Sequence, residues 1–356
     1  MLAPLPGAWQ SIYSPWPLEQ AGGWRLFYGG WDGTDTPNDR VYSLTTSDFL
    51  SFGNRTLVID HGQFQHVNNV NVTQLPDGSM HMICTTLVDN NSNDKPAYFS
   101  SPDGVTWNGS PEPYSAQLTD VVSIENDPLY PGYDYNGGNV LLRDNGGWTL
   151  YYSDGVYGGQ SGAVYRATTT GSPPVFQSAG SSLATQHYSN DVKKLTVSGK
   201  DWYLMALYIE EAKAPVPSPT FSYSLSNDSV QFGKEQKMFG GSSIQDQYPT
   251  TPAFVMKRNQ LLGVLYGGNP IDLLNAQDSI FARWLQKKLV ISDASGAQQT
   301  IVGAYGPDRQ WLQTAGGTFQ GTIAVYAEDG LTPLAAGAVN VSAGTAYQLV
   351  LTSNGQ

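Results

Sequence analysis

A unit of four predicted strands recurs five times along this chain, and the repeat limits the possible folds more than any other feature. It is clearest between His66 and Trp107, where NNVNVTQL, SMHMICTTL and PAYFSS alternate apolar and polar residues. The links PDGS, VDNNSND and PDG separate these segments, and a short fourth strand begins at VTW. Alternation with a period of two predicts strands, and links rich in Asp, Gly and Asn predict antiparallel hairpins.

The other copies keep the same order of strand, turn and polar loop. The second strands of the five units are centred near Leu26, Met82, Leu150, Leu204 and Val264, so the period is about 54–68 residues. A single unit of this kind cannot bury both of its faces, so the units must pack around a common axis. The repeat therefore predicts an all-β fold, a five-bladed β-propeller.

The repeat also predicts how the chain is divided into domains. The five units are expected at about 11–60, 61–120, 121–180, 181–240 and 241–293. Residues 1–10 either lead into the first unit or add an outer strand to the last blade and close the ring. Further strands are expected after residue 293, but the long polar loop of the repeat is missing there. We expect a propeller domain at 1–293 and a small C-terminal β accessory segment at 294–356.

The composition narrows the class of protein and its surroundings. With 39 Gly, 22 Pro and 13% charged residues, the chain suits a turn-rich β fold. Its net charge of −12 argues against nucleic acid as a partner, because phosphate binding needs a basic face. The apolar runs are too short to span a membrane, and no signal peptide is visible in MLAPLPGAW. Scarce lysine and abundant Asn, Ser, Thr, Tyr and Trp are typical of an exported bacterial protein, so we expect a secreted or periplasmic monomer.

In a propeller, the first strand of each blade lines the central channel. The loop that enters this strand and the loop between strands two and three open on the same face, so residues far apart in sequence converge on one funnel. The converging segments are rich in Asp, Glu and aromatic residues. Aromatic rings stack on sugar faces, and paired carboxylates hydrolyse glycosidic bonds, so this lining suits a carbohydrate. The alternative is that Asp and Asn only cap turns in polar loops.

The repeat resembles the five-bladed propeller glycoside hydrolases, the set that includes family 43 arabinanases, xylosidases and arabinofuranosidases. The resemblance covers about residues 11–293 and lies in the strand pattern. It implies a base, an acid and a third carboxylate at the starts of innermost strands. The comparable positions here are Tyr13, Asn69, Gly137, Asp191 and Thr251, of which only Asp191 is carboxylic. Either the catalytic set has moved to neighbouring loops, or the chemistry differs, or the funnel is not catalytic.

The candidate catalytic residues are the acids expected around the funnel: Asp191, Asp39, Glu210, Asp32 and Asp134. Asp191 is the first choice because burial at the start of a channel-lining strand would raise its pKa and suit proton transfer. Alternation places Lys193 on the same side as Asp191, where it would lower that pKa again. Each of these acids could instead cap a turn, and Asp39 could form a structural pair with Arg40.

The candidate substrate-binding residues are the cation, imidazoles, amide and rings expected beside these acids: Arg40, Trp31, His66, Asn69, His187, Tyr135 and Tyr248. Two histidines without tight spacing make a poor metal motif, so no catalytic metal and no cofactor are expected. The oxygen-rich channel leaves a structural Ca²⁺ open. SSPDGVTWNG resembles the Asp-box of sialidases, a hairpin between outer strands, but no trio of arginines suits a sialic carboxylate.

Together these patterns predict a glycoside hydrolase-like protein that cleaves glycosidic bonds of a plant or microbial polysaccharide or oligosaccharide. A non-catalytic carbohydrate-binding propeller is the main alternative, since four of the five comparable positions lack an acid. A protein-interaction scaffold is the third, and it predicts exposed apolar patches on the funnel face.

Overall fold

The structure is a computed structural model. It describes residues 2–3, 11–31, 38–47, 49, 51–88, 94–128, 135, 138–154, 162–171, 175–185, 187–197, 199–208, 220–240, 246, 248–269, 278–284, 286–293, 298–304, 309–313, 319–326, 333–341 and 346–350. Within these ranges the protein is built almost entirely from strands. Contacts divide the chain into a first unit, Met1–Gln260 with Leu265–Ala282, and a second unit, Leu261–Val264 with Arg283–Gln356.

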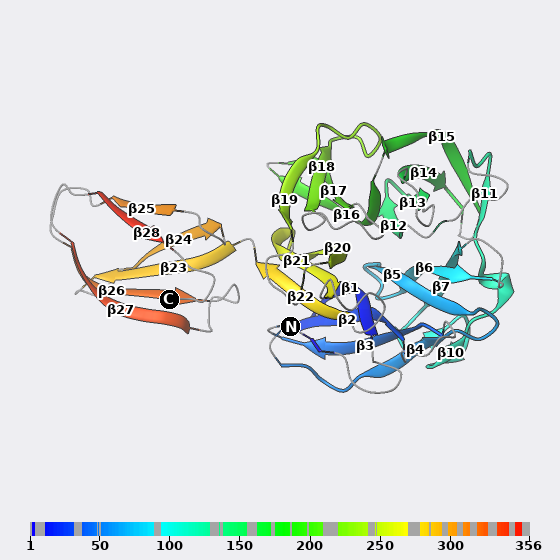
Figure 1. The fold of residues 1–356 in the computed structure, drawn as a ribbon, viewed down its shortest axis with the longest axis horizontal. Coiled ribbons are helices and arrows are strands. Elements are labelled where there is room, and N and C mark those ends of the chain that lie inside the picture. The colour runs from blue at the N-terminus through cyan, green and yellow to red at the C-terminus, as the bar shows by residue number, and fades with distance from the viewer. Residues whose placement is uncertain are drawn as a thin grey trace. The chain divides into compact units, whose positions relative to one another are not determined.

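Five antiparallel sheets stand around a common centre in the first unit, so the predicted five-bladed β-propeller is confirmed (Figure 1). Blade 1 contains β1 (Ser11–Gln20), β2 (Gly23–Trp31), β3 (Arg40–Thr46), β4 (Thr56–Asp60) and the parallel outer strand β10 (Tyr114–Ser115). Blade 2 contains β5 (His66–Gln74), β6 (Met80–Leu87) and β7 (Asp94–Ser101), followed by the hairpin of β8 (Thr106–Trp107) and β9 (Ser110–Pro111) and the short 3-10 helix η1 (Leu118–Asp120).

The remaining blades follow the same order. Blade 3 contains β12 (Asn139–Asp144), β13 (Gly147–Asp154), β14 (Ala163–Thr169), β15 (Val175–Thr185) and the parallel outer strand β11 (Ser123–Glu125). Blade 4 contains β16 (Tyr188–Val197), β17 (Lys200–Tyr208), β18 (Thr220–Ser226) and β19 (Gln236–Gly240). Blade 5 contains β20 (Tyr248–Lys257), β21 (Gln260–Asn269) and β22 (Ser279–Trp284). The innermost strands are therefore β1, β5, β12, β16 and β20.

The N-terminus closes the ring. Leu2 forms an antiparallel bridge with Ile280 of β22, with N···O distances of 2.8 and 3.0 Å. In Figure 1 the N-terminus accordingly lies beside β22. The sequence left two roles open for residues 1–10: a lead-in to the first unit, or an outer strand that closes the ring. Leu2 supports the second, because it adds backbone pairing to the outer edge of the last blade.

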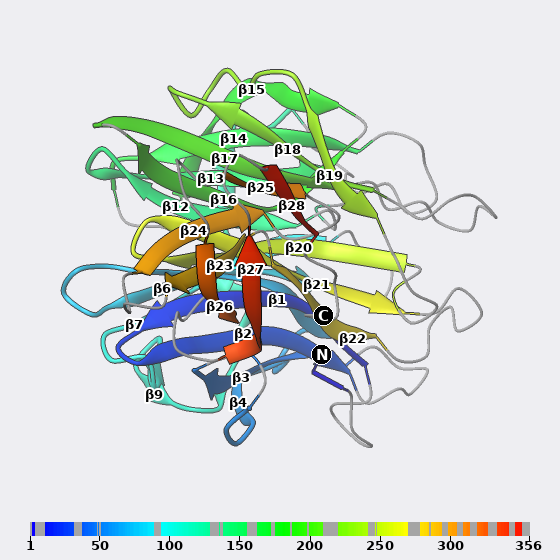
Figure 2. The ribbon, with the colours of Figure 1, turned by 90° about the vertical axis from the view of Figure 1, so that its left-hand side faces the viewer.

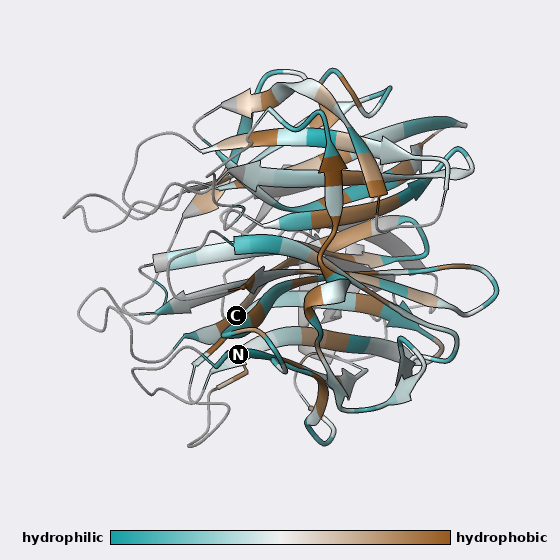
Figure 3. Ribbon diagram, turned by 90° about the vertical axis from the view of Figure 1, so that its right-hand side faces the viewer, coloured by the Kyte–Doolittle hydropathy of each residue, from teal (hydrophilic) through white to brown (hydrophobic). Residues whose placement is uncertain are grey.

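Both faces of a blade are buried, because alternate residues of one strand point to opposite sides. In β6, Met82 and Cys84 pack in one apolar cluster with residues of blade 1, whereas Ile83 packs in another with Trp148 and Leu150 of blade 3. Hydrophobic and hydrophilic segments accordingly occur along the same propeller strands (Figure 3). The seven-residue β3 is likewise buried over most of its length. The core thus lies between blades, which explains why one repeat could not fold alone.

The second unit is also all β. Its four-stranded sheet has the order β24-β23-β26-β27, with β23 (Gln286–Asp293), β24 (Gln298–Ala304), β26 (Phe319–Tyr326) and β27 (Pro333–Val341). A two-stranded sheet pairs β25 (Arg309–Gln313) with β28 (Ala346–Val350). Strand β23 pairs with β24 and β26 and so belongs to this unit, whereas the sequence-based boundary lies after it. Strands of this unit are labelled in Figure 2.

The Asp-box hairpin after β7 is present as the sequence indicates. Asp103 accepts hydrogen bonds from the backbone N–H of Val105 (2.9 Å) and Thr106 (2.7 Å), which lower its pKa to about 2. Trp107 is fully buried and donates its indole N–H to Glu112 (3.0 Å). The box is therefore a structural hairpin that anchors a large ring in the core.

A second turn of this kind follows β18 in blade 4. Asp228 accepts hydrogen bonds from Ser226 (2.8 Å) and from the backbone N–H of Val230 and Gln231 (2.9 and 2.7 Å). Sequence reasoning missed it, although SNDSVQF keeps the order Ser, Asp and a later aromatic residue.

We predict that Trp107→Ala destabilises the propeller strongly, because it removes a fully buried ring that meets Phe27 edge-on at 6.5 Å. The expected loss of apparent unfolding free energy is about 3–5 kcal/mol, measured by chemical denaturation. Val105→Ala in the same hairpin is the control. Its side chain is 52% exposed, so its effect should stay within about 0.5 kcal/mol. Equal effects of the two variants would contradict a role for Trp107 in the core.

Candidate active site at the mouth of the propeller

Three aspartates occupy corresponding positions at the starts of third strands. Asp39 precedes β3 in blade 1, Asp94 begins β7 in blade 2 and Asp278 precedes β22 in blade 5. Each backbone carbonyl accepts a hydrogen bond from the segment that leads into, or begins, the next blade's innermost strand. The donors are Val67 N–H to Asp39 (2.9 Å), Tyr135 N–H to Asp94 (3.3 Å) and Ile12 N–H to Asp278 (3.0 Å). This shared backbone contact holds the three residues at the same end of neighbouring blades.

His66, the first residue of β5, lies between two of these carboxylates. Its Nε2 is 2.7 Å from Asp94 Oδ1, and its Nδ1 is 3.6 Å from Asp39 Oδ2. The exposed fractions of the three side chains are small, at 14% for His66, 12% for Asp39 and 6% for Asp94. Sequence reasoning expected His66 at the funnel, and the structure places it against two acids from different blades.

Asp39 is surrounded by further hydrogen-bond donors. The amide of Asn68 donates to Asp39 Oδ2 (3.4 Å) and to the hydroxyl of Tyr13 (3.3 Å). Burial raises the pKa of Asp39, while His66, Tyr13 and Asn68 oppose that rise. Burial, with the charge of Asp39, raises the pKa of Tyr13 well above its usual value, so its phenol stays protonated and can donate. His66, Tyr13 and Asn68 thus offset part of the cost that burial imposes on the charged form of Asp39.

Asp278 has a different setting. It accepts hydrogen bonds from the amide of Asn269 (2.6 Å) and the hydroxyl of Ser11 (3.4 Å), both neutral donors. Burial raises the pKa of Asp278 to about 6, and the charge of Asp39 adds to the rise. Trp31, partly exposed at the end of β2, is the register partner of Ser11, which brings an aromatic residue to the same edge.

Asp39 and Asp278 therefore place two carboxyl groups at the mouth of the propeller, the end where the third strands begin. Burial raises the pKa of both, but His66 opposes the rise at Asp39, whereas Asp278 meets the neutral donors Asn269 and Ser11. Two neighbouring carboxyl groups in different surroundings suit acid–base catalysis. One carboxyl can give a proton while the other accepts one. The signal that could have located the set is in the sequence: NDR, NDK and QDS stand at 38–40, 93–95 and 277–279, directly before equivalent strands.

Asp191 lies deeper, in β16, and its side chain is fully buried. Its Oδ2 accepts a hydrogen bond from the backbone N–H of Phe254 (2.7 Å), and its Oδ1 is 3.2 Å from Lys193 Nζ. Lys193 Nζ also stands 3.3 Å from the ring centroid of Trp16. Burial raises the pKa of Asp191 to about 6 and Lys193 lowers it, as the alternation of the strand predicts. Asp191 thus bridges blades 4 and 5 through the channel.

The other predicted residues are dispersed. Arg40 pairs with Asp60 (2.7 Å) instead of Asp39, and His187 pairs with Glu235 (3.2 Å). Asn69 accepts a hydrogen bond from Ser14, and Tyr135 donates one to Asp127. Four predictions lie outside the described residues or side chains: Asp32, Asp134, Glu210 and the side chain of Tyr248.

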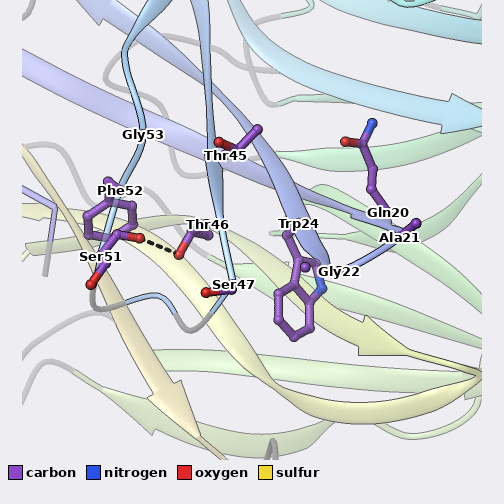
Figure 4. A pocket seen from close by; sticks show the side chains of 11 residues that line it. Gln20, Ala21, Gly22, Trp24, Thr45, Thr46, Ser47, Ser51, Phe52 and Gly53 are labelled. Carbon is purple, nitrogen blue, oxygen red and sulfur yellow. Dashed lines mark hydrogen bonds between the residues drawn. The ribbon is translucent and has the colours of Figure 1, made fainter.

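A cavity of about 450 Å³ opens at the opposite end of blade 1, between the β1–β2 turn and the segment after β3 (Figure 4). Gln20, Trp24, Thr45, Ser47 and Phe52 contribute to its lining, and none of its lining residues is ionisable. The cavity therefore offers no group for acid–base chemistry, unlike the mouth.

Within the described ranges, no group of three or more His, Cys, Asp or Glu side chains is arranged to hold a metal ion. The same part of the chain includes no helix of the length and hydropathy needed to span a membrane.

Comparison with known proteins supports the fold. No protein-family model matches the sequence, and no curated protein matches it. Solved structures do match. A family 32 β-fructofuranosidase of Bombyx mori has a TM-score of 0.53 at 11% identity, over 98% of this chain and 89% of that chain. A thermostable family-43 glycoside hydrolase has a TM-score of 0.52 at 12% identity, over 86% of this chain and 96% of that chain.

The chain has the fold of the propeller glycoside hydrolases. A third structure, from the family 130 mannoside phosphorylases and glycoside hydrolases, has a TM-score of 0.52 at 13% identity, over 79% of this chain and 90% of its own length. At these identities the likeness shows the fold alone. The resemblance inferred from the strand repeat is thus confirmed at that level.

We predict that Asp191→Asn lowers the unfolding free energy by about 3–5 kcal/mol at pH 7.5, because it leaves the charge of Lys193 buried without a counter-ion. The double variant Asp191→Asn with Lys193→Met should recover part of this loss in a chemical denaturation cycle. Lys194→Met is the matched control, since Lys194 is more exposed and its loss should cost about 1 kcal/mol or less. A fully stable Asp191→Asn variant would contradict the structural pair.

A second prediction concerns Asp278 and pH. Its folded-state pKa of about 6 lies above the ordinary value of 3.8, so between these values the folded chain holds a proton that the unfolded chain releases. Its contribution to stability is therefore largest at low pH and is lost as pH rises through 6. Unfolding free energies at pH 4.5 and 6.5 should fall less steeply with pH in Asp278→Asn than in the wild type. Identical slopes would show that the pKa is not raised.

Proposed function

We propose that the protein hydrolyses glycosidic bonds of a plant or microbial polysaccharide or oligosaccharide at the propeller mouth. One observation carries the proposal: Asp39 and Asp278 interact electrostatically and have unlike neighbours, since His66 opposes the rise that burial causes in the pKa of Asp39, whereas Asp278 meets neutral donors. The shared fold of known glycoside hydrolases supports the same reaction class. We also propose that the protein acts outside the cytoplasm as a monomer.

The two carboxyl groups take complementary roles. Asp278 gives its proton to the glycosidic oxygen as the bond to the anomeric carbon breaks. Charged Asp39 either takes a proton from the attacking water or attacks the anomeric carbon itself. In the first case water supplies the hydroxyl group directly, and in the second it releases a glycosyl-enzyme ester in a later step. Trp31 supplies an aromatic face for the sugar at the same edge.

Acidic residues elsewhere in the chain are the competing candidates for the catalytic roles. Asp191 remains a candidate from the innermost strand, and Asp32, Asp134 and Glu210 remain candidates from the funnel loops. The mouth pair is preferred because Asp39 and Asp278 keep partial exposure, whereas no part of the Asp191 side chain reaches solvent.

The second candidate function is a non-catalytic carbohydrate-binding propeller. It is favoured by the residues at the comparable innermost positions, where Tyr13, Asn69 and Thr251 carry no carboxyl group. This alternative predicts that a glycan array captures the wild-type protein while no bound glycan is cleaved over long incubation.

We predict that Asp278→Asn lowers kcat about 10²–10⁴-fold on glycans with a poor leaving group, because the general acid is lost. The loss should be much smaller with a dinitrophenyl glycoside, whose leaving group needs no proton. Asp39→Asn should impair both substrates. Wild-type kcat/KM should decline above about pH 6 as Asp278 loses its proton.

The control is Asp60→Asn, which removes the charge paired with Arg40 (2.7 Å) and keeps an oxygen that can accept from the N–H of His61. It should leave turnover and the pH profile close to those of the wild type. Normal turnover by the folded Asp278→Asn and Asp39→Asn variants would refute the assignment of the mouth pair. If a stably folded Asp191→Asn variant lost turnover instead, the innermost-strand assignment would replace it.

A further inference from the structure

His66 is held between acids that come from two blades. Its Nε2 is within hydrogen-bond distance of Asp94 Oδ1 at 2.7 Å, and its Nδ1 faces Asp39 Oδ2 at 3.6 Å. Both ring nitrogens are therefore directed at carboxylates. Such a ring is oriented by one acid and acts electrostatically on the other, as in sites where a carboxylate fixes the orientation of an imidazole.

The effect of His66 depends on the other groups around Asp39. Among the described residues, the groups that interact with it include His66 and Asn68 from β5, Tyr13 from β1, Asp94 from β7 and Asp278 from the approach to β22. Asp94 disfavours a charge on Asp39, and so does burial. Tyr13 and Asn68 offer neutral hydrogen bonds, so His66 is the group in this set that opposes burial with charge.

We propose that His66, oriented by Asp94 at 2.7 Å, is a positioning residue that favours the charged form of Asp39. This inference rests on the proposed function and deepens it. It attributes the different roles of Asp39 and Asp278 to interactions that run from Asp94 through His66 to Asp39. Asp94 fixes the ring through Nε2, which leaves Nδ1 toward Asp39. His66 thus acts through Asp39 and not by contact with the sugar.

A second histidine, His187, provides a comparison with His66. His187 stands just before β16 as His66 stands at the start of β5, but Nε2 of His187 pairs with Glu235 at 3.2 Å. In blade 4 the third strand begins with Thr220, so the carboxylate that corresponds to Asp94 is missing there. A histidine near the start of an innermost strand is therefore not sufficient, and the two flanking aspartates distinguish His66.

The test compares His66→Gln, Asp94→Asn and the control His187→Gln in the full-length protein. In His66→Gln the acid limb of the kcat/KM profile should move up by about one pH unit, because a charge that favours ionised Asp39 is lost. KM should change little, while kcat on the acid side falls. Asp94→Asn should move the limb up by less, because the loss of the acid that orients His66 is partly offset by the loss of a like charge near Asp39. His187→Gln should leave the limb unchanged.

A second readout does not depend on turnover. The carboxyl carbon of Asp39, followed by ¹³C NMR titration and assigned with Asp39→Asn, should titrate at higher pH in His66→Gln than in the wild type. An unshifted titration in folded His66→Gln overturns the proposal, whatever the activity. If no glycan is cleaved by the wild type but the titration shifts, the proposed function fails while the coupling between His66 and Asp39 stands. If His66→Gln does not fold, His66→Asn decides by the same titration.

Discussion

The central constraint on this structure is the inner edge of each blade. The first strand of a blade pairs with a strand on one side only, so backbone N–H groups on its other edge face the buried channel and need partners. Side chains from adjoining blades or strands supply them. Asn71 accepts from the N–H of Leu141 (3.0 Å), Asp191 from Phe254 (2.7 Å) and the hydroxyl of Thr251 from Ser14 (3.1 Å). The polar channel is thus the means by which sheets without a common hydrogen-bond ladder hold together.

Irregularities in the innermost strands bring these side chains into reach. Ser14, Asn69 and Thr251 adopt left-handed backbone angles, with φ of 47°, 47° and 46°. Register shifts interrupt β1 between Tyr13 and Trp16, β5 between Asn68 and Asn71, and β16 between Tyr188 and Asp191. A bulge redirects the side chains that follow it. The residues directly after the three shifts, Trp16, Asn71 and Asp191, each bond to the innermost strand of the next blade.

These bulges explain where sequence reasoning reached its limit. Strand alternation and turn residues were sufficient to predict five blades, because each depends on local contacts that recur in every unit. Counting back from the second strand could not detect an inserted residue, so it compared Tyr13 before a shift, Asn69 within one and Asp191 after one. A one-residue slip reverses the face to which a side chain points. The structural counterparts of Asp191 are Asn71 and Trp16, which indicates a blade-linking position that happens to carry a carboxylate.

The acids of the mouth avoid this difficulty because they lie at the starts of third strands, and β3 and β7 pair with the second strands of their blades without a register shift. Their distribution is uneven around the ring: blades 5, 1 and 2 carry Asp278, Asp39 and Asp94, whereas blades 3 and 4 have Gly162 and Thr220 at the corresponding starts. The carboxyl groups are therefore gathered on one side of the mouth, where each raises the cost of ionising its neighbours. His66 relieves that repulsion for the acids on either side of it, whereas Asp278 accepts from the neutral donors Asn269 and Ser11. The unlike surroundings of Asp39 and Asp278 thus follow from which blades carry an aspartate and from the imidazole placed between two of these acids.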